Sequence, residues 1–113
     1  MRDFTYSEAK AIVSELGRFE IENYDHYGLR VISVGHEEYA IGTDGECDYA
    51  WDMALESYLE ECIYPELSGN LANYFDDDKW KSHAMDDGRG HALSIYDGDE
   101  IELDAGLYAF RIN

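Results

Sequence analysis

Apolar residues recur every three or four positions in two stretches of the chain, and this spacing predicts two amphipathic helices. The first covers residues 6–16, and the second, much longer, covers residues 46–63, a stretch without Gly or Pro. A Thr followed three residues later by a Glu marks the start of each helix as a capping box: Thr5 with Glu8, and Thr43 with Glu46. The longer helix carries a broad apolar stripe along one side, which suits packing against a sheet.

Short runs that are β-branched or alternate between apolar and polar residues predict strands. Two such runs precede the long helix, at residues 29–34 and 39–41. Three more lie near the C-terminus, at residues 92–96, 100–103 and 107–112. Gly-containing turns separate the last three runs, as they do in antiparallel hairpins.

The order of these elements indicates an α+β fold. Two short helices are expected at residues 67–75 and 78–85, whereas residues 19–27 have no clear assignment. No linker or internal repeat interrupts the chain, so we expect one domain over residues 1–113. It consists of an antiparallel sheet of about five short strands, with one long acidic amphipathic helix and shorter helices packed on one face.

Composition supports a folded chain in spite of its high charge. Apolar residues make up 45% of the 113 residues and aromatic residues 14%, which is enough for one modest core. No apolar run approaches the roughly 18 residues of a membrane span, and no apolar signal segment follows the N-terminus, so we expect a cytoplasmic protein. Cys47 and Cys62 are separated by about 22 Å along the long helix, which excludes a disulfide within it and predicts two buried free thiols.

The chain is strongly acidic: 26 Asp and Glu oppose 8 Lys and Arg, for a formal net charge of -18. Residues 31–78 hold 13 of the acids and no Lys or Arg. Such an imbalance disfavours direct binding to nucleic acid and to anionic membranes, which both require cations on the protein. A positively charged partner is attracted instead.

Five acids fall at every fourth position of the long helix, and we call this row the acidic ridge: Asp44, Asp48, Asp52, Glu56 and Glu60. Positions i and i+4 stack on one helix face about 6 Å apart, so the ridge resembles the regularly spaced charges of a phosphate strand. Repulsion between these neighbours costs the helix a few tenths of a kcal/mol per pair. The row therefore favours a functional role, and a merely solvated or salt-adapted surface is the alternative.

No pattern of catalytic or metal-binding residues stands out. The four histidines have no zinc-site spacing, alone or with the cysteines, and no nucleophile elbow, Walker loop or dinucleotide motif is present. The acidic runs at residues 76–78 and 97–100 lack the alternating ligands of a calcium loop. We therefore expect no enzymatic activity, no cofactor and no metal.

One short segment, residues 86–91, is unusual because two glycines flank Arg89 and His91 follows. One interpretation is a loop that presents Arg89 and His91 to an anionic ligand. The simpler interpretation is that Arg89 pairs with acids of the same molecule while the glycines form a turn.

Two motifs resemble those of a group of small uncharacterised proteins from bacteriophages and related mobile elements. They are Tyr-Ala-Ile-Gly-Thr-Asp-Gly-Glu-Cys-Asp at residues 39–48 and Asp-Gly-Arg-Gly-His-Ala-Leu-Ser-Ile-Tyr-Asp-Gly at residues 87–98. The resemblance implies a small accessory protein that acts inside a bacterial host, and it carries over no catalytic residues. Separately, the charge profile is similar to that of phage-encoded DNA-mimic inhibitors, including antirestriction and anti-CRISPR proteins, which share no common fold.

Our leading hypothesis is a non-enzymatic DNA mimic that occupies a basic nucleic-acid-binding channel of a host defence protein, either a CRISPR effector or a restriction enzyme. The acidic ridge would carry the contact, with Trp80 as an apolar anchor and with five further acids: Glu37, Glu38, Asp76, Asp77 and Asp78. The inhibitor would act as a monomer or small homo-oligomer. The runner-up is a phage accessory protein that binds a small molecule or a metal through the loop from Asp86 to His91, which includes Arg89. A third candidate is a phage structural or assembly protein.

Overall fold

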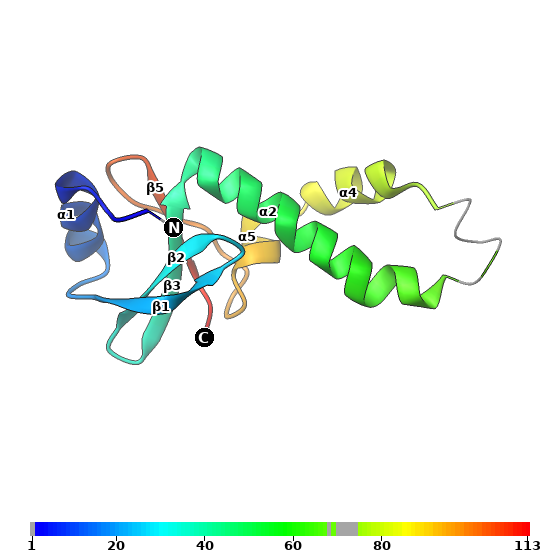
Figure 1. The fold of residues 1–113 in the computed structure, drawn as a ribbon. Helices are drawn as coiled ribbons and strands as arrows, with labels where there is room; N and C mark the ends of the chain where they lie inside the picture. The colour runs from blue at the N-terminus through cyan, green and yellow to red at the C-terminus, as the bar shows by residue number, and fades with distance from the viewer. Residues whose placement is uncertain (1, 68, 70–74) are drawn as a thin grey trace.

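The computed structural model describes residues 2–67, 69 and 75–113. They form the expected α+β fold, in which helices pack against a five-stranded antiparallel sheet of order β1-β2-β3-β5-β4 (Figure 1). The strands are β1 (Glu20–His26), β2 (Leu29–Val34), β3 (Glu37–Thr43), β4 (Ile101–Glu102) and β5 (Leu107–Arg111). The helices are α1 (Tyr6–Glu15), α2 (Asp44–Tyr58), α4 (Asp77–Met85) and α5 (Arg89–Leu93), with a π-helical turn η1 (Leu59–Ile63) and a 3-10 turn η2 (Tyr64–Glu66) after α2.

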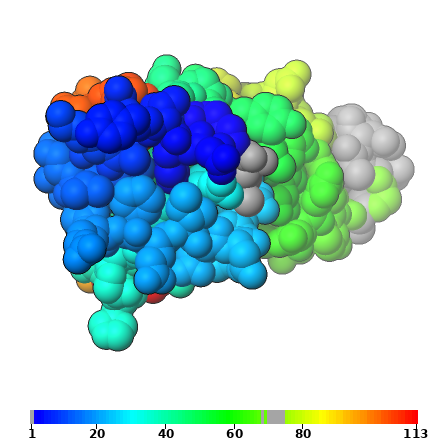
Figure 2. All heavy atoms as spheres, turned by 60° about the vertical axis from the view of Figure 1, so that its left-hand side comes forward, coloured from blue at the N-terminus to red at the C-terminus, as the bar shows by residue number. Residues whose placement is uncertain are grey.

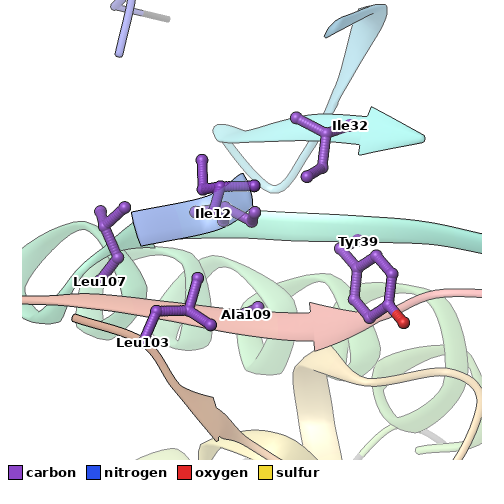
Figure 3. Packing of buried hydrophobic residues seen from close by; sticks show 7 residues of the cluster. Ile12, Ile32, Tyr39, Leu103, Leu107 and Ala109 are labelled. Carbon is purple, nitrogen blue, oxygen red and sulfur yellow. The ribbon is translucent and has the colours of Figure 1, made fainter. Parts of the chain in front are cut away.

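Helices cover both faces of the sheet, so the expectation of helices on one face only is wrong. Ile12 of α1 packs on one face with Ile32 and Ala109 (Figure 3). On the opposite face Phe110 packs with Cys47 of α2. Successive residues of a strand point to opposite faces, and the central strands bury residues of both sets. Two apolar faces require two covering layers.

One predicted strand is also wrong. Residues 92–96 do not join the sheet; the chain instead forms α5, which buries Leu93 completely next to α2, and then an irregular segment. Ile95 and Tyr96 are 69% and 57% exposed, so the alternating pattern at this place does not reflect a buried sheet face. The Ser94 hydroxyl donates to the Asp97 carboxylate at 2.8 Å, and this side-chain contact holds the turn.

The fifth strand is β1, in the stretch that had no assignment. It pairs only with β2 and forms one edge of the sheet. Its register shifts between Ile21 and Asp25, which marks a bulge, and most of its residues are exposed. A bulged and exposed edge strand needs no regular alternation of apolar residues, which explains why the pattern gave no prediction there.

Both predicted capping boxes are present. The Thr5 hydroxyl accepts from the Glu8 amide at 3.2 Å, and the Glu8 carboxylate accepts from the Thr5 amide at 2.9 Å. Thr43 and Glu46 exchange the same pair of hydrogen bonds at 3.3 and 2.9 Å. These reciprocal bonds satisfy amides that have no partner within a helix, and they fix where α1 and α2 begin.

The end of the long helix differs from the prediction. The chain is α-helical only to Tyr58 and then widens into the π turn η1. Cys62, expected on the buried stripe, is exposed because this turn alters the periodicity that the stripe depends on. Cys47 is buried and free as predicted, and its burial raises the pKa of the thiol to about 12. The predicted helix at residues 67–75 falls largely outside the described residues, and the one at 78–85 is confirmed as α4.

A network of ion pairs joins the starts of α1 and α2. The Arg2 guanidinium donates to both carboxylate oxygens of Glu8, at 2.6 and 2.7 Å, and to both of Glu46, at 3.0 Å each. Hydrogen bonding by Arg2 lowers the pKa of the buried Glu8 carboxyl to about 2. Glu8 is therefore ionised in the folded chain well below the pH at which an unfolded chain would bind a proton there.

Replacing Glu8 by Gln is expected to lower the free energy of unfolding by about 1–2 kcal/mol at pH 7. The pKa of Glu8 in the folded chain, about 2, lies below its ordinary value of 4.5. The extra stability of Glu over Gln is therefore fully present above pH 4.5 and disappears as the pH falls towards 2. Urea unfolding of both proteins at several pH values measures this difference. Glu15→Gln, at the exposed end of the same helix, is the control. A Glu8→Gln difference that does not change with pH would contradict the assignment.

Candidate partner-binding surface

α2 continues beyond the edge of the sheet, and α4 returns beside it (Figure 1). We call this projection, from the second half of α2 through η1 and η2 to α4, the arm. The rings of Tyr58 and Trp80 stack between its two helices, with centroids 5.6 Å apart and planes 8° from parallel. The arm makes the molecule elongated: its radius of gyration is 16.0 Å, whereas a compact chain of this length has about 13 Å.

Arg89 holds the start of the acidic ridge. Its guanidinium donates to Asp44 at 2.8 Å, to Asp48 at 2.9 Å and to Glu100 at 2.7 Å. It also lies over the Tyr108 ring, 4.8 Å from the centroid, and its side chain is only 10% exposed. The simpler interpretation of residues 86–91 is confirmed in that Arg89 pairs with acids of the same molecule, but these acids are not its neighbours Asp86 and Asp87, and Gly90 lies within α5 and not in a turn.

Lys81 of α4 holds the next part of the ridge. Its ammonium group donates to Asp52 at 3.2 Å and to Glu56. Glu60 is the one ridge acid that has no cation within 4 Å among the described residues. The ridge thus docks α4 and α5 onto α2, which explains how the helix tolerates a row of like charges. α2 itself contains no Lys or Arg. The cations that pair with its acids lie 25 to 45 residues further along the chain, so the pattern of this one helix could not predict them.

The paired ridge acids stay accessible. The exposed fraction of the side chain is 70% for Asp44, 61% for Asp48, 55% for Asp52 and 45% for Glu56. A partner can therefore reach their outer oxygens, but two internal cations reduce the field of the five carboxylates.

The predicted residues Glu37 and Glu38 do not join the ridge. They begin β3, whereas Asp44 follows its other end, and a strand of this length separates them by about 20 Å. Figure 2 shows the β2–β3 turn projecting from the lower edge of the molecule, away from the green arm. Glu37 lies 3.5 Å from Arg111, and Glu38 accepts a hydrogen bond from the Tyr24 hydroxyl.

The three predicted aspartates at the start of α4 belong to the arm. Asp76 caps the helix by accepting from the Lys79 amide at 3.0 Å. Asp77 accepts from the Tyr64 hydroxyl at 2.6 Å, and this bond raises the pKa of Tyr64 to about 12. Asp78 is exposed and makes no hydrogen bond or ion pair within the described part of the chain.

Internal pairing leaves most of the negative charge uncompensated. All 26 acids lie in the described residues, and nine of them have a cation within 4 Å. The other 17 have no cation within this distance among the described residues, and six of these gather on the arm: Glu60, Glu61, Glu66, Asp76, Asp77 and Asp78. Glu61 and Glu66 were missed from the sequence because they fall outside the four-residue row; the only signal was the absence of cations from residues 31–78.

Other kinds of site have little support within the described residues. There, no three His, Cys, Asp or Glu side chains gather in a way that would hold a metal ion. His91 is exposed and stands outside the Arg89 cluster. None of the described helices combines the length and the apolar character that crossing a membrane requires.

In comparisons with protein-family models, with curated proteins and with solved structures, none matches this chain. The function must therefore be argued from the surface itself.

Proposed function

We propose that this chain is a non-enzymatic inhibitor that imitates DNA and occupies a basic nucleic-acid-binding channel of a bacterial host defence protein, such as a CRISPR effector or a restriction enzyme. The observation that carries the proposal is the charge left after internal pairing: 17 acids have no cation within 4 Å in the part of the chain that the structure describes. Such a surface attracts a basic channel and accelerates association with it. The resemblance of two sequence motifs to those of phage proteins implies that this action takes place in the cytoplasm of the host.

The arm and the ridge together form the contact surface in this proposal. The unpaired acids of the arm supply most of the attraction, because no cation of residues 2–67, 69 and 75–113 lies within 4 Å of them. The ridge acids add regularly spaced charges whose positions are fixed by Arg89 and Lys81, so little conformational entropy is lost when a partner binds. Trp80, partly exposed on α4, supplies an aromatic contact among these charges.

The test is displacement of a short fluorescent DNA duplex from a host CRISPR effector or restriction enzyme. Reversing three exposed arm acids, Glu60→Lys, Glu66→Lys and Asp78→Lys, is expected to weaken displacement by about tenfold or more. Displacement by the wild type is also expected to weaken steeply between about 50 and about 200 mM NaCl, because the contact is mainly electrostatic.

A second triple variant separates the arm from net charge alone. Glu15→Lys, Glu20→Lys and Asp104→Lys change exposed acids away from the arm by the same total charge. This variant is expected to displace the duplex within about threefold of the wild type. Equal weakening by both triples would reject the arm as the contact, and no displacement by the wild type from any such enzyme would reject the function. If the acids merely adapt the surface to salt, the wild type is expected to displace no DNA.

A further inference from the structure

A cavity of about 580 Å³ opens between α2, α4 and α5 at the base of the arm. This volume lies within the range of sites that hold small ligands. Ala54 and Leu55 of α2 and Ala84 of α4 form apolar walls, and the stacked rings of Tyr58 and Trp80 lie at its edge. The cavity is therefore a pocket with an aromatic platform.

The charged groups that line this pocket are acidic. Glu61 comes from η1 and Asp87 from the segment before α5, and neither has a described cation within 4 Å. No Lys or Arg is among the described residues that line the pocket; the other ionisable groups there are His83, His91, Cys62 and the Tyr hydroxyls. An anionic ligand would meet two carboxylates without a compensating charge, whereas a cation finds complementary partners.

Uncommon backbone conformations form two parts of the wall. The π turn η1 supplies Glu61, Cys62 and Ile63 to the pocket. Tyr27, in the two-residue turn between β1 and β2, has φ 52, as this kind of tight hairpin turn requires, and its side chain forms another part of the wall. Such π turns are frequent at functional sites, and here one forms part of the cavity wall.

We propose that this pocket receives an arginine side chain from a flexible segment of the basic partner. A guanidinium stacks on aromatic rings and pairs with carboxylates, while its methylene stem lies along apolar walls. Trp80, Glu61 and Ala84 provide these three kinds of contact. The volume also admits the residues that flank the arginine. This inference rests on the proposed function, since it takes the partner to be a basic protein.

The two tryptophans give a direct measurement. In ¹⁵N-labelled full-length protein the Trp80 indole N–H reports on the pocket, and the Trp51 indole N–H, whose side chain does not line it, is the internal reference. A capped Gly-Arg-Gly peptide is expected to shift the Trp80 signal saturably and to leave the Trp51 signal in place. The same peptide with citrulline, a neutral isostere of arginine, is expected to cause no shift.

Matched variants test the two carboxylates. Glu61→Gln and Asp87→Asn are each expected to raise the Kd of the peptide by about 3- to 10-fold, whereas Glu66→Gln, an exposed arm acid outside the pocket, is expected to change it by less than about twofold. Equal effects of all three would show general attraction to an acidic surface and overturn the pocket. Binding of free agmatine as tightly as the peptide would assign the pocket to a small guanidine metabolite, and no saturable shift would also reject the proposal. None of these outcomes depends on DNA displacement, so the proposed function stands or falls separately.

Discussion

Replacing Arg89 by Ala is expected to lower the melting temperature by about 10 °C. Arg89 is nearly buried and donates to three carboxylates, so its loss removes charged hydrogen bonds and a contact with the Tyr108 ring. Asp44 and Asp48 then repel each other without a cation between them. The carboxylates are exposed to solvent, which limits the energy of each hydrogen bond to Arg89. We therefore expect the free energy of unfolding to fall by about 2–3 kcal/mol in total. Thermal unfolding followed by circular dichroism measures the change, at about 4 °C per kcal/mol for a chain of this size.

Two further variants identify the cause. Lys79→Ala removes the same charge from an exposed side chain with no acid within 4 Å among the described residues, and it is expected to shift the melting temperature by less than about 2 °C. Arg89→Lys keeps the charge but cannot reproduce the planar arrangement of donors, so it should recover less than half of the loss. If Arg89→Ala and Lys79→Ala shift the melting temperature equally, the effect is net charge and not the local cluster.

Gly90→Ala is expected to destabilise the fold by about 2–4 kcal/mol, or to prevent folding. A Cβ atom at this position would lie 2.4 Å from the Gly98 carbonyl oxygen and 2.9 Å from the Glu100 amide nitrogen. Both are backbone atoms, which cannot move aside as a flexible side chain can, and overpacking of this kind is costly. The free energy of unfolding in urea measures the change.

Gly45→Ala provides a control of opposite sign. Gly45 lies in the first turn of α2, and nothing lies within 4 Å of a Cβ built there. Replacing Gly by Ala within a helix reduces the entropy lost on folding, so this variant is expected to be about 0.5–1 kcal/mol more stable than the wild type. Destabilisation by both substitutions, to a similar degree, would contradict the crowding at Gly90.

Local rules predicted the elements whose determinants lie close together in the sequence. The capping boxes at Thr5 and Thr43 place the starts of α1 and α2 because each box needs only four consecutive residues. β2 followed from its β-branched run in the same way, whereas β1, which also precedes α2, was not predicted. Long-range contacts decided the places where these rules failed. Residues 92–96 have the composition of a strand, but burial of Leu93 beside α2 favours a helix there.

In the candidate site, too, local patterns were predicted from the sequence and long-range contacts were not. Periodicity alone revealed the acidic ridge, because a helix places every fourth residue on one face. Periodicity could not reveal that Arg89 and Lys81 return to this face, since only the fold brings α4 and α5 beside α2. Nor could it show that Glu37 and Glu38 lie at the other end of β3. The sequence located the excess charge, and the fold determined how much of it remains for a partner.

The contacts of Lys81 with Asp52 and Glu56 give the arm a property beyond its shape. These carboxylates hold α4 in place, and in the proposed function they also face a cationic partner. Each cation of the partner that approaches these carboxylates competes with Lys81 for them. The arm therefore behaves as an ion exchanger in which the ion to be displaced is a side chain of the same molecule. Attachment of α4 and affinity for the partner are then thermodynamically linked, and the same rise in salt that weakens binding also loosens α4 from α2.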